Sequence, residues 1–214
     1  KNIFLVSQDC HPQTIDLLST RAKPLGIQIV VGEIETLIKD NTGLFFGFIA
    51  QYPNTLGLID DFKFSISQAK SQEAISILAC DILSLTILKS PGELGADIAV
   101  GSSQRFGVPI GFGGPHAAFI SCKEEFKRLL PGRIIGRSID KNDNLAYRMA
   151  LQTREQHIRR EKATSNICTA QSLLAIVATA YAMYHGPEGL RKIAFRVHRL
   201  ARILNKCLQE MGYK

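Results

Sequence analysis

The hydrophobic and polar positions of the first hundred residues alternate between two kinds of segment. After Pro12, apolar residues recur at helical spacing until Gly26, and a second helix is predicted over residues 62–69 with Asp60 or Asp61 as its cap. Strands that alternate with helices predict an α/β fold with a mostly parallel, doubly wound sheet covered on both faces. The predicted strands are the short, almost wholly apolar runs at residues 3–6, 27–31, 44–51, 75–79 and 96–100.

Beyond residue 106 the pattern becomes less regular, and the chain ends in helices. One helix is predicted from a cap at Ser165 or Asn166 to Tyr184, where Gly186 and Pro187 stop it. A last helix carries an apolar stripe, with most of its lysines and arginines off the stripe. The elements predicted in this part are strands at residues 117–120, 134–139 and 147–151, a helix at 123–130, and the last helix at 190–211.

These elements predict a domain organisation. We expect residues 1–186 to form part of a large domain, and residues 187–214 to be a linking helix that leads to a small domain outside this chain. The chain begins with Lys1 and goes directly into a strand, without a basic and then apolar signal segment. It is therefore expected to be a fragment of a longer protein.

Composition narrows the class of protein. With 45% hydrophobic and 21% charged residues, the chain is typical of a globular protein, and no apolar run approaches the roughly 18 residues of a membrane span. The five cysteines are scattered, without a C-x-x-C pair or a Cys/His cluster, so a metal site is not expected. Isolated cysteines of this kind are typical of small buried residues in a reducing compartment.

Charge is unevenly distributed along the chain. Residues 1–122 carry 8 Lys/Arg against 11 Asp/Glu, and residues 123–214 carry 18 against 8. A net charge of +10 in the second part favours an anionic partner. Nucleic acid is not expected, because no aromatic residues interleave with the basic runs. An acidic protein or a phosphorylated ligand fits better.

Residues 101–116 (GSSQRFGVPIGFGGPH) form the most informative segment. Their glycines and prolines are incompatible with a regular element and indicate a backbone that turns tightly. In an α/β protein, a polar glycine-rich loop after a strand is a common ligand site, and His116 is a candidate to face the ligand. The loop has neither Walker nor G-x-G-x-x-G spacing. A purely structural glycine loop is the alternative.

Several motifs resemble the N-terminal half of the glycine cleavage system P-protein family. They are residues 10–14 (CHPQT), 51–53 (QYP), 102–116, 151–160 (LQTREQHIRR) and 162–171 (KATSNICTAQ). The resemblance implies a type I pyridoxal 5'-phosphate (PLP) fold made of two homologous halves, in one chain or in separate subunits, with such pairs forming a dimer. It implies PLP-dependent decarboxylation of glycine and transfer of the aminomethyl group to the lipoyl arm of the H-protein.

The resemblance also implies that this half lacks the cofactor-binding lysine. In the family's catalytic half, a His-Lys-Thr-Phe motif precedes a glycine loop. Aligning the two loops sets Gln104 at the lysine position and Ser103 at the histidine position. An amide forms no imine, and the neighbouring Arg105 is permanently protonated. We therefore expect no catalytic residue here and PLP bound by the other half, while Asp81 is a candidate for the aspartate that meets the pyridine nitrogen.

A basic cluster between Arg148 and Lys162 is the other notable feature. Thr164, Ser165 and Asn166, just after it, are predicted helix caps, with an anion site at that helix N-terminus as the alternative. The functional interpretation of the cluster is a loop that meets a phosphate, a carboxylate or an acidic carrier protein. The alternative is an interface ion-pair network or solvated charge. The cluster consists of Arg148, Arg154, His157, Arg159, Arg160 and Lys162.

The resemblance predicts that the complete protein is a glycine dehydrogenase (decarboxylating) and that this fragment alone is inactive. The location would be the cytoplasm in a bacterium or the mitochondrial matrix in a eukaryote. An assembly half that contributes nothing to the site is the alternative. A stand-alone aminotransferase is disfavoured, because position 104 carries no lysine.

Overall fold

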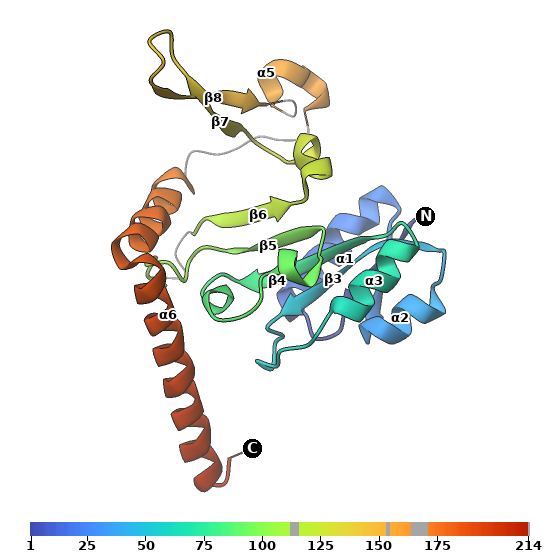
Figure 1. The fold of residues 1–214 in the computed structure, drawn as a ribbon. Helices are drawn as coiled ribbons and strands as arrows, with labels where there is room; N and C mark the ends of the chain where they lie inside the picture. Colours follow the sequence, from blue (N-terminus) through green and yellow to red (C-terminus); the bar gives the residue numbers. More distant parts are fainter. Residues whose placement is uncertain (112–115, 153–154, 164–170, 214) are drawn as a thin grey trace. The chain divides into compact units, whose positions relative to one another are not determined.

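The structure is a computed structural model that describes residues 1–111, 116–152, 155–163 and 171–213 (Figure 1). It divides into two compact units. The first consists of Lys1–Ser121 together with Ser172–Lys214, and the second is Cys122–Gln171. No helix in the described ranges combines the length and the hydropathy of a membrane span.

The first unit is built on a six-stranded sheet with the order β2-β1-β3-β4-β5-β6. The pairs β1/β2, β1/β3, β3/β4 and β4/β5 are all parallel, which confirms the predicted sheet. Every residue of β3 but one is buried, as its continuous apolar run predicts. The strands are β1 (Ile3–Ser7), β2 (Gln28–Gly32), β3 (Phe45–Tyr52), β4 (Ile75–Asp81), β5 (Ile98–Ser102) and β6 (Ala118–Cys122).

Helices cover both faces of this sheet (Figure 1). Successive side chains of a strand point to opposite faces, and Leu5 of β1 belongs to one hydrophobic cluster while Val6 belongs to another. The helix α1 (Pro12–Ala22) packs on the cluster of Val6. The helices α2 (Ile34–Asp40) and α3 (Lys63–Ser71) pack on the cluster of Leu5. The prediction of a sheet covered on two sides is therefore confirmed.

Local hydrogen bonds explain where these helices begin. The carboxylate of Glu33 accepts from the backbone N–H groups of Glu35 and Thr36 at 2.9 and 2.7 Å, and so caps α2, a helix that the pattern did not predict. Asp61 accepts from the backbone N–H of Lys63, the first residue of α3, at 3.1 Å, but the N-cap of this helix is Phe62 and not Asp60 or Asp61 as predicted. The remaining short helices of this unit are η1 (Lys23–Leu25), η2 (Ser84–Thr86) and α4 (Pro91–Leu94).

The first unit ends in α6 (Ser172–Glu210), which is two helices joined at a kink. Gly186, with φ 60° and ψ 179°, leaves the helical region, and Pro187 follows it, so the predicted stop is confirmed. Beyond the kink, the apolar stripe lies open, with Leu200 56% and Leu204 60% exposed. The predicted caps at residues 165 and 166 lie outside the described residues. The division predicted at residue 186 falls at the kink and stays a prediction.

The second unit is organised around an antiparallel hairpin. The strands β7 (Ile134–Ile139) and β8 (Leu145–Leu151) pair from Ile134 opposite Leu151 to Ile139 opposite Leu145. The helix predicted over residues 123–130 is the 3-10 helix η3 (Glu124–Leu129). Two short helices follow the hairpin, α5 (Gln156–Arg159) and η4 (Arg160–Lys162).

Candidate functional site

The candidate site lies at the carboxyl ends of β4 and β5. These strands are neighbours, and their last residues, Asp81 and Ser102, stand opposite each other in the register. The glycine-rich segment begins here and places Gln104 and Arg105 just beyond β5. Because ligands of α/β proteins bind outside the carboxyl ends of parallel strands, this edge is where a cofactor is expected.

Asp81 and Arg105 form an ion pair at this edge. The Nη1 of Arg105 lies 3.3 Å from the Oδ2 of Asp81, and the two side chains are 47% and 29% exposed. The other carboxylate oxygen of Asp81 accepts from the backbone N–H of Leu83 at 3.1 Å. The negative charge of Asp81 is therefore already compensated by a residue of this chain.

Ser103 and Gln104 are also held by hydrogen bonds. The buried Ser103 donates from both its backbone N–H and its hydroxyl to the carbonyl oxygen of Ala117, each at 2.9 Å. The backbone N–H of Gln104 donates to the hydroxyl of Ser102 at 3.1 Å, and the carbonyl of Gln104 accepts from Val108 at 3.1 Å. The start of the glycine-rich segment is thus a turn in which Ser103 and the backbone of Gln104 are hydrogen-bonded to the turn itself, to β5 and to residue 117.

A cavity of about 420 Å³ adjoins the ion pair. Asp81, Arg105, Ser84 and His198 contribute polar groups, and the rest of the wall is apolar. No lysine lines it. Cys80, the residue before Asp81, is buried, and burial followed by the charge of Asp81 raises the pKa of its thiol to about 12. Cys80 is therefore a protonated, unreactive thiol at neutral pH.

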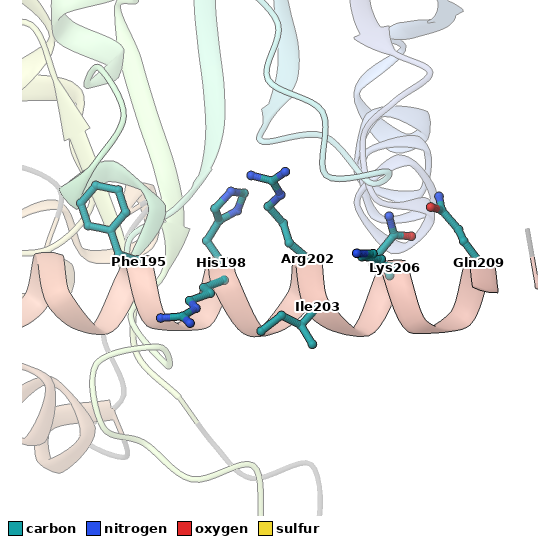
Figure 2. A pocket seen from close by; sticks show the side chains of 8 residues that line it. Phe195, His198, Arg202, Ile203, Lys206 and Gln209 are labelled. Atoms are coloured by element: carbon teal, nitrogen blue, oxygen red, sulfur yellow. The ribbon is translucent and has the colours of Figure 1, made fainter. Parts of the chain in front are cut away.

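A second hollow lies on the surface of α6 and is not an enclosed site. All the residues that line it come from this one helix, and Figure 2 shows their side chains projecting from successive turns. It is an open helix face that carries both basic and apolar groups. The side chains labelled in the figure are Phe195, His198, Arg202, Ile203, Lys206 and Gln209.

The basic cluster belongs to the second unit, where one acidic residue anchors it. The side chain of Glu155 is only 7% exposed, and its Oε2 lies 3.4 Å from the Nε of Arg133, the residue before β7. This pair ties the segment after β8 to the start of the hairpin. The ring of His157 lies 3.0 Å from the Oε1 of Gln152, which orders the first turn of α5. The pair of Arg133 and Glu155 was not predicted from the sequence.

The structure brings part of the predicted cluster together. His157, Arg159 and Arg160 lie within one short segment and are exposed, and Arg160 has a positive φ of 52°. His116, at the far end of the glycine-rich segment, is exposed. Four of the predicted site residues lie outside the described residues: Arg154, Thr164, Ser165 and Asn166. Among the described residues, no group of three His, Cys, Asp or Glu side chains could hold a metal ion.

The sheet order, its covering helices and the polar edge define a class: the fold is that of type I PLP-dependent enzymes. Cystathionine gamma-lyase from Lactobacillus plantarum shares the fold with a TM-score of 0.50 and 19% identity, over 58% of this chain and 33% of that chain. A crystal structure of glycine decarboxylase (P-protein) of the glycine cleavage system, in inhibitor-bound form, is far more similar. Its TM-score is 0.89 at 36% identity, over 98% of this chain and 49% of that chain.

The family follows from the sequence match. The family model "Glycine cleavage system P-protein" matches residues 1–214, and the chain therefore belongs to this family. It is 59% identical over 213 residues to the glycine dehydrogenase (decarboxylating) of Nostoc punctiforme, and 58% identical over 214 residues to that of Pelagibacter ubique. Both matches cover 100% of this chain, but the chain spans only 22% of the length of each relative.

The described residues of this chain do not fit a covalently held PLP. Position 104, which the resemblance aligns with the family's lysine, carries an amide. Asp81, the candidate partner of the pyridine nitrogen, is engaged by Arg105 and by the backbone of Leu83. The adjoining cavity offers no lysine as a substitute.

Proposed function

We propose that this chain is part of a glycine dehydrogenase (decarboxylating) that removes CO₂ from glycine and transfers the aminomethyl group to the lipoyl arm of the H-protein. The proposal is supported by the family match over the whole chain and by the 59% identity to a relative of that name. When bound, PLP supplies the electron sink for decarboxylation. The isolated chain is inactive, because it holds no amine where the cofactor would be attached.

Within that enzyme, this chain is part of the half that does not carry the cofactor. The assignment rests on the residues at the edge of the sheet. Position 104 carries an amide there, and Asp81 is paired with Arg105. PLP is held by the catalytic half, in the same chain or in a separate subunit. Pairs of halves form a dimer in a reducing compartment, either the cytoplasm of a bacterium or the matrix of a mitochondrion.

The basic cluster is this half's contribution to function. His157, Arg159 and Arg160 are exposed in the structure, as side chains that meet a phosphate, a substrate carboxylate or the acidic H-protein would have to be. The alternative is an assembly half with no role in the site. The glycine-rich turn favours that alternative for the sheet edge, since Ser103 and the backbone N–H of Gln104 are hydrogen-bonded within this chain.

Borohydride reduction of the full-length enzyme in the presence of PLP tests the assignment. Peptide mapping should find one stoichiometric adduct, on a lysine outside residues 1–214, and none within residues 97–116. Glycine–bicarbonate exchange, measured with and without H-protein, should require that adduct-forming lysine. A stoichiometric adduct within residues 97–116 would contradict the proposal.

A further inference from the structure

We infer that the Asp81–Arg105 ion pair closes this half to PLP by charge, so that its arginine stands in for the cofactor ring. The inference rests on the proposed function in one respect, namely that the enzyme uses PLP and holds it elsewhere. It goes beyond the absence of a lysine. A missing lysine removes the covalent bond, whereas an occupied aspartate removes the ionic site as well.

Both carboxylate oxygens of Asp81 are already engaged by this chain. Its Oδ1 accepts from the backbone N–H of Leu83 at 3.1 Å, which fixes the rotation of the carboxylate. Its Oδ2 lies 3.3 Å from the Nη1 of Arg105. A guanidinium N–H and a pyridinium N–H are chemically alike here, because both are cationic donors to a carboxylate. Arg105 therefore satisfies the group that would otherwise attract the ring.

The backbone around Arg105 is fixed by its own turn. The N–H of Phe106 donates to the carbonyl of Ser103 at 2.9 Å, and that of Val108 donates to the carbonyl of Gln104 at 3.1 Å. The two hydrogen bonds that Ser103 donates to the carbonyl oxygen of Ala117 hold one end of the turn. The Cα of Arg105 is thus held close to the end of β4, and the arginine can leave Asp81 only by rotating its side chain into solvent.

The helix α6 holds the other end of this turn. The rings of Phe106 and Tyr181 stack with centroids 6.1 Å apart. Gly107 has a φ of +81°, and a Cβ at this position would lie 2.5 Å from the ring of Tyr181, so the turn lies in direct contact with the helix. The turn that carries Arg105 is therefore packed from both sides. This explains how a half-exposed arginine keeps its place.

The test restores the lysine and then removes the arginine, in the full-length holoenzyme. The variants are Gln104→Lys, Gln104→Lys with Arg105→Ala, and the triple variant that adds Asp81→Asn. The readouts are PLP equivalents per chain after dialysis and the borohydride-stable adduct at position 104. We expect little adduct in the single variant and at least about tenfold more in the double variant. The triple variant should return to the level of the single one, because the pyridinium loses its counter-ion.

Three results would overturn the inference. They are equal labelling of position 104 in the single and double variants, no labelling in either, and full labelling in the triple variant. Failure of the proposed function is visible separately in the unmodified enzyme, as an adduct within residues 97–116 or no adduct anywhere. The two proposals therefore fail in different samples.

A second measurement applies even if a lysine at position 104 prevents folding. Amide hydrogen exchange at residues 103–108 should quicken about two- to fivefold in Arg105→Gln and in Asp81→Asn, as expected for a partly exposed ion pair. The double variant should exchange no faster than the faster single variant, because both changes remove the same interaction. Rate increases that multiply in the double variant would show that the two residues act independently, and the inference would be wrong.

Discussion

Gly101 lies directly against the backbone of Cys80. The two residues face each other in the register of β4 and β5, and a Cβ added to Gly101 would lie 2.3 Å from the carbonyl oxygen of Cys80. The same Cβ would lie 2.6 Å from the ring of Phe119. Neither the strand backbone nor the ring can move aside cheaply, so only glycine fits. The close contact holds together the edge of the sheet that carries Asp81.

Gly101→Ala is therefore expected to destabilise the protein. Overpacking of this kind costs about 1–3 kcal/mol, and the collision with backbone places the expected loss in the free energy of unfolding at the upper end of that range. Denaturant titration of the full-length protein, followed by hydrogen exchange in β4 and β5, measures the loss.

Gly92→Ala provides the matched control. Gly92 lies in α4, and a Cβ there meets nothing within 4 Å. The control should leave stability unchanged or raise it by up to about 1 kcal/mol, because alanine favours a helix over glycine. A Gly101→Ala protein as stable as this control would mean that the strands are less closely packed than the structure has them.

The buried cysteines should resist alkylation. Burial raises the pKa of Cys10 to about 11 and that of Cys80 to about 12, while Cys207 is exposed. At pH 8 the two buried thiols stay protonated and shielded, so iodoacetamide should label Cys207 far faster, as read by peptide mass spectrometry. The raised pKa values stabilise the fold below pH about 9, and this contribution is lost as the pH rises towards 11. Rapid labelling of Cys80 in the native chain would contradict the burial.

The open stripe on α6 predicts self-association of residues 1–214 expressed alone. Leu200 and Leu204 are more than half exposed, and burying each one contributes about 1.5–3 kcal/mol. Changing both to Glu should shift the chain towards monomer in sedimentation experiments without lowering its melting temperature. Lys192→Glu, on an exposed position of the same helix, should leave association unchanged. A monodisperse wild-type monomer would show that the stripe needs no partner.

The sequence predicted the elements whose signals are local. The run that becomes β3 is almost wholly apolar, and Gly26 and Gly186 mark helix ends at which their positive φ values favour glycine. The helix α2 was missed, because its cap is Glu33 and not one of the usual Ser, Thr, Asp or Asn residues. The segment at 124–129 forms a 3-10 helix, and the periodicity of so short a segment does not distinguish a 3-10 helix from an α-helix.

The site was predicted only in part, for a physical reason. Asp81 and Arg105 were each singled out along the chain, but their pairing depends on the register of β4 against β5 and on the turn after β5. Such a relationship between distant residues leaves no trace in local pattern. Likewise, Glu155 and Arg133 are far apart along the chain, and only the fold shows that Arg133 holds Glu155 in place.

The basic cluster leads to the last prediction, and Arg160 is its sharpest test. Arg160 has φ 52° and ψ −123°, a backbone conformation that costs a residue with a Cβ about 1–2 kcal/mol and glycine almost nothing. Arg160→Gly therefore removes the guanidinium while relieving the backbone. If the Arg160 side chain is only solvated charge, the variant should be at least as stable and fully active. If the side chain meets a phosphate, a carboxylate or the H-protein, activity should fall while stability holds or rises.

We expect the second outcome in the full-length enzyme. Glycine–bicarbonate exchange should fall at least tenfold for at least one of Arg154→Ala, Arg159→Ala and Arg160→Gly, since losing an arginine that pairs with a desolvated anion costs about 2–5 kcal/mol in binding. The loss should be clearest in the dependence on H-protein or PLP concentration. Arg137→Ala, an exposed arginine of β7 outside the cluster, is the matched control and should change neither activity nor stability by more than about half a kcal/mol.

Arg133→Ala separates anchoring from contact. It removes the guanidinium of Arg133 from the buried carboxylate of Glu155, so stability and activity should fall together. This parallel loss is the signature of a structural role, and the three cluster variants should not show it. Should all three retain normal exchange rates and normal dependence on H-protein, the cluster has no role in the site or in docking. The +10 charge of residues 123–214 would then reflect a solvated surface.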